Sequence, residues 1–361
     1  MSERAWGTVR EDYSADGKPW EYLPHEHARS QAFRWSEDGL AGICDVHQRL
    51  CLGLALWNGR DRMLKERIFG LNGDEGNHGE DAKEYWWYLD ALPSHAWLRW
   101  RYHYPQAAFP YDDLVATNRA RTRQDPEYEL LDTGAFDGDR YWVVEVDYAK
   151  ADPTDVLMRV RVTNAGAEEA ELHVLPTLWF RNRWDWEPGV ARPTLRAERS
   201  SVVIAEEETL GCYALTAGPA PDGTAPQLLF CENETNAERL FGSAESPAYP
   251  KDGIGEHVLR GAAWVNPDAV GTKAAAWYRL SLGGGESAEL RLRLRLRPSG
   301  AAPARAGARP RLRARDGGAR ARGGRVLRRA GAGGLHRRRA RDHAPGVRRS
   351  DLGQAVLRLR R

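Results

Sequence analysis

The stretch that decides the fold runs from Thr154 to Phe180 and reads TDVLMRVRVTNAGAEEAELHVLPTLWF. From Val156 to Val162 every second residue is apolar, and leucine and arginine stand between, which is the two-residue period of a strand with one buried face. A turn of sequence Asn-Ala-Gly follows at 164–166, and Leu172 and Val174 begin a second alternating run. The pattern predicts a β-hairpin.

A second stretch, SAELRLRLRLRP at 287–298, alternates four leucines with four arginines. This predicts an amphipathic strand with one dry and one wet face, in preference to an arginine stripe that binds a ligand. The preceding glycine run at Gly283–Ser287 is expected to be a hairpin loop. Further strands are expected at Gly39–Trp57 (broken by a turn), Ala96–Tyr104, Tyr141–Tyr148, Ser201–Ala205, Cys212–Ala217 and Ala274–Leu282.

Helical periodicity is thin, and Asp61–Phe69 is the best short candidate. Many strands with little helix predict a mainly β chain, built as one large antiparallel β-sandwich of the supersandwich kind. The composition, with 42% hydrophobic and 29% charged residues, is typical of a globular protein.

The sequence also argues against a membrane span, a signal peptide and a zinc site. No run approaches the roughly 18 apolar residues of a membrane span, and the first residues lack the apolar core of a signal peptide. None of the four cysteines forms a CxxC pair, so reduced thiols are expected and zinc is not. We therefore expect a cytoplasmic protein with no membrane partner, no cofactor and no metal.

Residues 301–361 differ sharply from the rest of the chain. They hold 19 Arg, no Lys, three Asp and no Glu, a net charge of +16, whereas residues 1–300 carry −14 and every Trp, Tyr and Phe. A nucleic-acid-binding arm and a disordered tail are two interpretations of such a segment. The arm is disfavoured because no aromatic residue stands among the arginines to stack on bases.

The favoured interpretation is a frameshift near residues 298–309. Arg, Ala, Gly and Pro are the residues that a GC-rich gene encodes in a wrong frame. With plausible codons, the frame one nucleotide later restores acidic and aromatic residues, and its apolar residues fall at helical spacing. We expect residues 1–298 to be the β-sandwich domain and residues 299–361 to be a frameshifted, disordered or poorly structured tail that binds no nucleic acid.

Polar residues crowd the stretch GLNGDEGNHGEDAKEYWWYLD at Gly70–Asp90. Paired carboxylates suit glycoside hydrolysis, in which one protonates the leaving oxygen and the other activates water or attacks. A solvated, glycine-punctuated loop is the alternative. Metal binding by His78 with Glu80 and Asp81 is a weaker possibility, because neither an HExxH nor an EF-hand spacing is present.

Two aromatic stretches could bind sugars or pack inside the protein. HYPQAAFPYDDL at His103–Leu114 combines three aromatic residues, Tyr104, Phe109 and Tyr111, with two prolines, which predicts a rigid turn. LPTLWFRNRWDWEPG at Leu175–Gly189 carries three tryptophans among polar residues, which is typical of an interface or a sugar subsite. Packing beneath a loop, or in the core, is the alternative for each.

Several long motifs in this order resemble the amino-terminal part of bacterial glucosidases related to glycoside hydrolase family 63, which includes the mannosyl-oligosaccharide α-glucosidases. They are RMLKERIFGLNGDEGNHGEDAKEYWWYLDALPSH, YPQAAFPYDDL, EYELLDTGAF and HVLPTLWFRN, and the resemblance covers about residues 1–300. It implies a large β-sandwich that packs against an (α/α)6 barrel. It also implies inverting hydrolysis of α-glucosidic bonds in oligosaccharides by two carboxylates of that barrel.

The chain departs from this family where the barrel should begin, so the resemblance assigns no catalytic residue. We expect a glycoside hydrolase fragment that lacks the catalytic barrel and is inactive alone. The alternative is a stand-alone carbohydrate-binding or structural β-sandwich. The candidates for contact with substrate or barrel are His78, Glu80, Asp81, Lys83, Tyr85, Tyr104, Gln106, Phe109, Tyr111, Trp179, Arg181, Asn182 and Trp184.

Overall fold

The computed structural model describes residues 25–35, 38–68, 84–122 and 124–297. All of these residues belong to the first of the two units into which the chain divides, residues 1–320. The expected tail at 299–361 and the candidates His78, Glu80, Asp81 and Lys83 lie outside the described residues.

The predicted fold class is confirmed, because the described chain is mainly β with two large antiparallel sheets. The five-stranded sheet has the order β1 (Leu40–Cys44), β2 (Leu50–Trp57), β7 (Ala170–Phe180), β13 (Lys273–Leu282) and β11 (Gln227–Cys231). The nine-stranded sheet has the order β12 (Val270–Gly271), β8 (Thr194–Arg199), β9 (Val202–Glu207), β10 (Gly211–Ala217), β14 (Ser287–Leu296), β6 (Asp155–Asn164), β5 (Tyr141–Asp152), β4 (Trp97–Pro105) and β3 (Trp86–Ala91).

The main hydrophobic core lies between the two sheets and takes inward-facing residues from most of their strands. Leu52 and Leu54 of β2 and Leu290 and Leu292 of β14 all belong to this core, as the alternation along 287–298 predicts. Arginines between the β14 leucines lie on the opposite face, where Arg293 pairs with an Asp155 carboxylate oxygen at 2.5 Å. The amphipathic-strand interpretation of this stretch is therefore confirmed.

The predicted hairpin at 154–180 is wrong. Its two strands exist, but β6 pairs with β5 and β14 in one sheet, and β7 pairs with β2 and β13 in the other. The glycine run at 283–286 likewise connects the two sheets, from β13 to β14, and is not a hairpin loop. A two-residue period fixes which face of a strand is buried, but it carries no information about which strand is the neighbour.

The two crossings between sheets lie against each other, and the buried Asn164 joins them. Its side-chain amide donates to the carbonyl oxygens of Glu168 at 2.7 Å and Leu282 at 2.9 Å. A Cβ at Gly284 would lie 2.3 Å from the Ala167 carbonyl oxygen, so the close approach of the two connections requires glycine there. The connections β6–β7 and β13–β14, each of which crosses from one sheet to the other, thus form two stacked arches.

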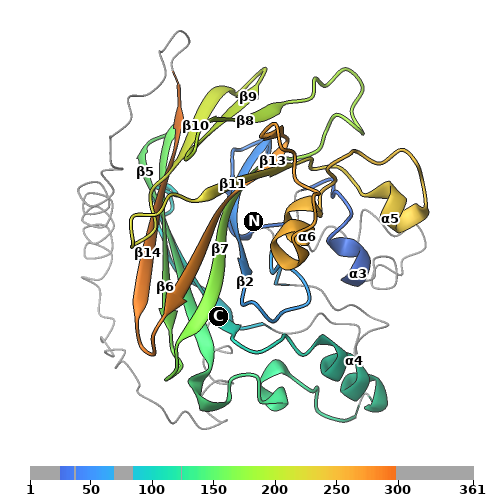
Figure 1. Cartoon of the computed structure of the whole chain (residues 1–361), viewed down its shortest axis with the longest axis vertical. Helices are drawn as coiled ribbons and strands as arrows, with labels where there is room; N and C mark the ends of the chain where they lie inside the picture. Colours follow the sequence, from blue (N-terminus) through green and yellow to red (C-terminus); the bar gives the residue numbers. More distant parts are fainter. Residues whose placement is uncertain (1–24, 36–37, 69–83, 123, 298–361) are drawn as a thin grey trace. The chain divides into compact units, whose positions relative to one another are not determined.

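Helices cover the outer face of the five-stranded sheet, the face that points away from the nine-stranded sheet. In Figure 1, α6 (Gly253–Arg260) lies beside this sheet, and α3 (His25–Ala28) and α5 (Ala237–Phe241) lie on the same side, with α5 farther from the strands. Ile254 and Val258 of α6 pack on Leu175 and Ala275. The other helices among the described residues are α4 (Tyr111–Ala120) and two 3-10 turns, η2 (Leu130–Thr133) and η3 (Asp137–Asp139).

The helix expected at Asp61–Phe69 is wrong over its described residues, 61–68. Lys65 instead forms a β-bridge with Leu56, with both backbone hydrogen bonds at 2.9 Å. Pairing with β2 thus satisfies this backbone and overrides a short helical pattern. In the described part of the chain, no helix is long and apolar enough to cross a membrane.

Candidate functional site

The first group of sequence candidates surrounds the end of β4 and is largely buried. Tyr104, Phe109 and Tyr111 are each at most 5% exposed. The Lys65 ammonium donates to the Tyr111 hydroxyl at 2.7 Å and lies 3.8 Å from the centre of the Phe109 ring. Because the rings enclose a cation inside the protein, they are not presented for stacking on a sugar. The alternative, aromatic packing beneath a loop, holds for this motif.

Buried acids complete this cluster, and the sequence did not single out their role. The Lys65 ammonium lies 3.0 Å from a Glu84 carboxylate oxygen, and the Tyr104 hydroxyl donates to Asp61 at 2.9 Å. Burial raises the pKa of both Asp61 and Glu84, against the opposing effect of the Lys65 charge. Raised carboxyl pKa values often mark catalytic acids. Here neither carboxyl lines one of the pockets described below, so we assign the cluster to stability.

Tyr85 belongs to the edge of the same region. It is half-buried, its hydroxyl donates to a Glu129 carboxylate oxygen at 3.3 Å, and its ring meets Phe136 edge-on at 5.6 Å between centres. It therefore braces the loop that carries η2 and η3.

The second group of candidates, at the end of β7, also braces the fold. Trp179 is 3% exposed, and Asn182 is fully buried, with its amide donating to the Asn233 carbonyl oxygen at 3.0 Å. The Arg181 guanidinium donates to backbone carbonyl oxygens, including that of Gln48 at 3.0 Å. The indole nitrogen of Trp184 donates to a Glu234 carboxylate oxygen at 2.8 Å, leaving few free polar groups on this motif for a ligand.

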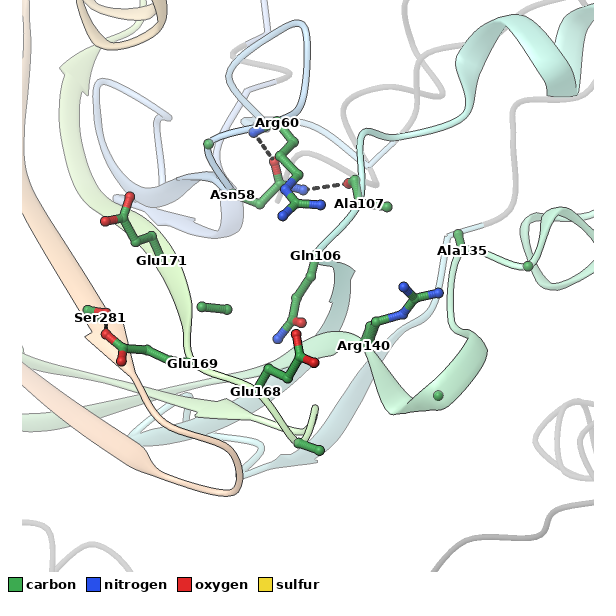
Figure 2. A pocket seen from close by; sticks show the side chains of 15 residues that line it. Asn58, Arg60, Gln106, Ala107, Ala135, Arg140, Glu168, Glu169, Glu171 and Ser281 are labelled. Carbon is green, nitrogen blue, oxygen red and sulfur yellow. Dashed lines mark hydrogen bonds between the residues drawn. The ribbon is translucent and has the colours of Figure 1, made fainter.

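Gln106 is the candidate that lines a large pocket. The pocket has a volume of about 700 Å³ and opens beside the two stacked arches (Figure 2). Gln106 is held in place because its amide nitrogen donates to the Asn164 side-chain oxygen at 2.7 Å. Asn58 fixes the adjoining backbone by donating to the carbonyl oxygens of Pro105 at 2.8 Å and Ala107 at 2.7 Å.

The walls of this pocket carry opposite charges. Figure 2 shows Glu171 of β7, Ser281 of β13 and Glu169, which directly precedes β7, on one side, with Arg60 and Arg140 across from them. Glutamates at a strand end and arginines in loops are typical of solvated surface, so no sequence pattern distinguishes them as site residues. Only the topology brings these distant positions to one hollow.

A second pocket of about 640 Å³ adjoins the first and shares Glu171 and Ser281 with it. Its lining adds His173, Trp277 and Arg279 from the uncovered end of the five-stranded sheet, beside α6. We call the two adjoining pockets the sheet groove. Its walls combine carboxylates, guanidinium groups and amides, which can donate to and accept from the hydroxyl groups of a neutral polar ligand.

The side chains of the second pocket are fixed by mutual contacts. The Trp277 indole nitrogen donates to His173 Nδ1 at 3.1 Å, and the Arg279 guanidinium lies 4.0 Å from the Trp277 ring centre. Burial, with help from the Arg279 charge, lowers the pKa of His173 to about 4, so its imidazole is neutral at pH 7. Among the described residues, no group of three or more His, Cys, Asp or Glu side chains could hold a metal ion.

Comparisons with known proteins add one substantial relative. No family model matches the chain. An uncharacterized protein of Saccharomyces cerevisiae, YMR196W, is 38% identical over an alignment of length 331, and the match covers 82% of this chain and 30% of that protein. The chain thus spans about 30% of the length of the curated relative that it matches.

Two solved structures are similar at a low level. The polysaccharide lyase BACCELL_00875 gives a TM-score of 0.28 at 11% identity, covering 68% of this chain and 25% of that one. The Slr1438 protein from Synechocystis sp. PCC 6803 gives a TM-score of 0.29 at 9% identity, covering 70% of this chain and 84% of that one.

Proposed function

We propose that residues 1–298 form the non-catalytic amino-terminal β-sandwich of a longer cytoplasmic glycoside hydrolase related to family 63, which acts on α-glucosidic bonds of oligosaccharides. The extent of the yeast match carries this proposal. The match takes 82% of this chain, about 296 of 361 residues, but leaves most of the yeast protein unmatched. A module that accompanies a larger partner domain would give such a match, and the family motifs lie in the same part of the chain.

In this proposal the sheet groove contributes to oligosaccharide binding next to the catalytic barrel. Its lining supports that role, because Arg140 and Glu171 offer a donor and an acceptor on opposite walls. The Gln106 amide lies between these two walls. In the adjoining part, the largely buried Trp277 holds polar groups in place, because it donates to His173 and carries the Arg279 guanidinium on its ring. Carbohydrate sites use such fixed polar groups to orient the ligand.

Hydrolysis of a nitrophenyl α-glucoside and of maltotriose tests the enzymatic part. We expect this chain to be slower than a protein extended by the carboxy-terminal domain by at least about 10³-fold, because the acid and base reside in that domain. Equal rates for the two proteins would contradict the proposal.

A stand-alone carbohydrate-binding sandwich is the second candidate, and the polar lining of the sheet groove favours it. Calorimetric titration of this chain with maltotriose separates the two. Millimolar or tighter binding without the barrel, lost in Glu171→Gln and kept in the exposed control Glu245→Gln, would favour the stand-alone module. Binding that requires the longer protein would favour the enzyme fragment.

We also propose that a frameshift near residues 298–309 separates this chain from its barrel. The change in charge and aromatic content at residue 301 supports it. Resequencing the gene across codons 295–312 tests it, and an intact frame in independent clones would remove it.

A further inference from the structure

Cys44 and Cys51 face each other across the hairpin that β1 and β2 form at the edge of the five-stranded sheet. The next pair toward the turn is joined by a backbone hydrogen bond from Asp45 N to Leu50 O at 3.4 Å. Because hydrogen-bonded and non-hydrogen-bonded pairs alternate, the two cysteines occupy a non-hydrogen-bonded pair, in which Cα atoms lie about 4.5 Å apart. Disulfides join Cα atoms separated by about 4.4–6.8 Å, so this position needs no backbone movement to accept one.

The two thiols differ in exposure and reactivity. They are cross-strand partners, but Cys44 is half-buried and Cys51 is fully buried. The hydrogen bond from Cys51 lowers the pKa of the Cys44 thiol, and the Arg181 charge adds to this effect against burial and Asp45. A thiol that is accessible and easily ionised attacks first, so Cys44 is the attacking group and Cys51 the resolving one.

The surrounding hairpin is held firmly in this register. The Asp45 carboxylate accepts from the backbone nitrogens of His47 at 2.9 Å and Arg49 at 2.6 Å. The Arg181 guanidinium donates to the carbonyl oxygen of Gln48 at 3.0 Å. These contacts keep the thiols opposed, which favours an intramolecular bond over pairing with another molecule.

We propose that Cys44 and Cys51 are a redox site that forms a reversible cross-strand disulfide with a low-molecular-weight disulfide such as oxidised glutathione. The Cys44 thiolate attacks one glutathione sulfur, and the glutathione disulfide breaks to release one glutathione thiolate. The Cys51 thiol then loses its proton and attacks Cys44 Sγ, which releases the second glutathione. Two protein thiols are oxidised and one glutathione disulfide is reduced to two thiols. The bond ties the edge strand β1 covalently to β2.

The other two cysteines serve as internal controls. Cys212 on β10 stands opposite Glu206, and burial with that carboxylate raises the pKa of its thiol. Cys231 is fully buried, and burial raises the pKa of its thiol to about 12. Neither has a cysteine as its cross-strand partner, since Cys231 pairs with Lys273.

Peptide mass spectrometry of the whole chain tests the proposal. The folded protein is incubated with oxidised glutathione, quenched with iodoacetamide, unfolded and digested with trypsin. Trypsin cleaves after Arg34, Arg49 and Arg60, so it places the two cysteines in different peptides. We expect peptides 35–49 and 50–60 to be joined and lighter by two hydrogen atoms. Alkylation of Cys44 should fall at least about tenfold and that of Cys212 less than about twofold. The joined peptides should disappear after treatment with dithiothreitol.

Two variants assign the order of attack. Cys51→Ser should accumulate a stable mixed disulfide at Cys44, because the resolving thiol is gone. Cys44→Ser should leave Cys51 unmodified, because Cys51 is buried. In the unsubstituted chain, a mixed disulfide at Cys44 without joined peptides, or full alkylation of Cys44 after oxidation, would overturn the proposal whether or not the variants fold.

Discussion

His103 should make the fold sensitive to mild acid. It lies on β4, on the outer face of the nine-stranded sheet, with ring centres 4.7 Å from Trp87 and 4.9 Å from Tyr141. Burial lowers the pKa of His103 to about 4, and the charge of Arg101 adds to the effect. In an unfolded chain the pKa of histidine is about 6.5.

The direction of the effect follows from proton binding. Between pH 6.5 and 4 the unfolded chain takes up a proton at this imidazole and the folded protein does not, so acid favours unfolding. The contribution to stability is fully present above pH 6.5 and is lost as the pH falls toward 4. At pH 4.5 the two pKa values give a loss of about 2.5 kcal/mol relative to pH 7.

The assay is urea unfolding at pH 7 and pH 4.5, followed by tryptophan fluorescence, for the unsubstituted chain and His103→Phe. Phenylalanine keeps the ring contacts and removes the titration. Between the two pH values, the variant should gain about 2.5 kcal/mol in free energy of unfolding relative to the parent chain. His47→Phe, at an exposed position, is the matched control.

His173 contributes in the same direction, since burial also lowers its pKa to about 4. It is more exposed, so solvent screens its contribution, and His103→Phe should keep part of the acid sensitivity. The reasoning fails if the difference between His103→Phe and the parent chain is the same at both pH values.

Three further substitutions test how the sandwich is held together, each by urea unfolding at pH 7. Lys251→Met should cost about 3–5 kcal/mol, because it strips a buried Asp38 carboxylate of an ammonium 2.5 Å away. Adding Asp38→Asn to Lys251→Met should recover part of that loss. If the loss in the double variant equals the sum of the losses in the two single variants, the pairing is contradicted. Asn164→Ala should cost about 2–4 kcal/mol, since it leaves two carbonyl oxygens at the stacked arches without their donor, and a loss within experimental error would refute that role. Trp179→Ala should lower the free energy of unfolding by about 3–5 kcal/mol, because Trp179 is buried. Trp186→Ala, at a position 42% exposed, should lower it by less than about 1 kcal/mol, and similar losses for the two variants would show that Trp179 is not a core residue.

Local sequence patterns predicted most strands of this protein. Alternation along β14 indicated the buried leucines, because a strand's two faces follow a two-residue period whatever its neighbours are. The same patterns did not distinguish aromatic packing from sugar binding at Tyr104 and Trp179. Apolar rings serve both purposes, and only burial shows which one holds.

The tertiary structure alone decided the pairing of strands and the position of the candidate site. Turn residues at 164–166 suit a hairpin and an arch equally well, and the choice depended on partners more than 100 residues away in β14 and β13. The sheet groove arises for the same reason. The sequence singled out Gln106 but not Arg140, Glu171 or Arg279. These residues line adjoining pockets because two sheets and two crossings bring them together. The sequence by itself determined which residues avoid water, since that is a property of each side chain and its period. Which surfaces meet is set by the free energy of packing the whole chain, and that is not a local property.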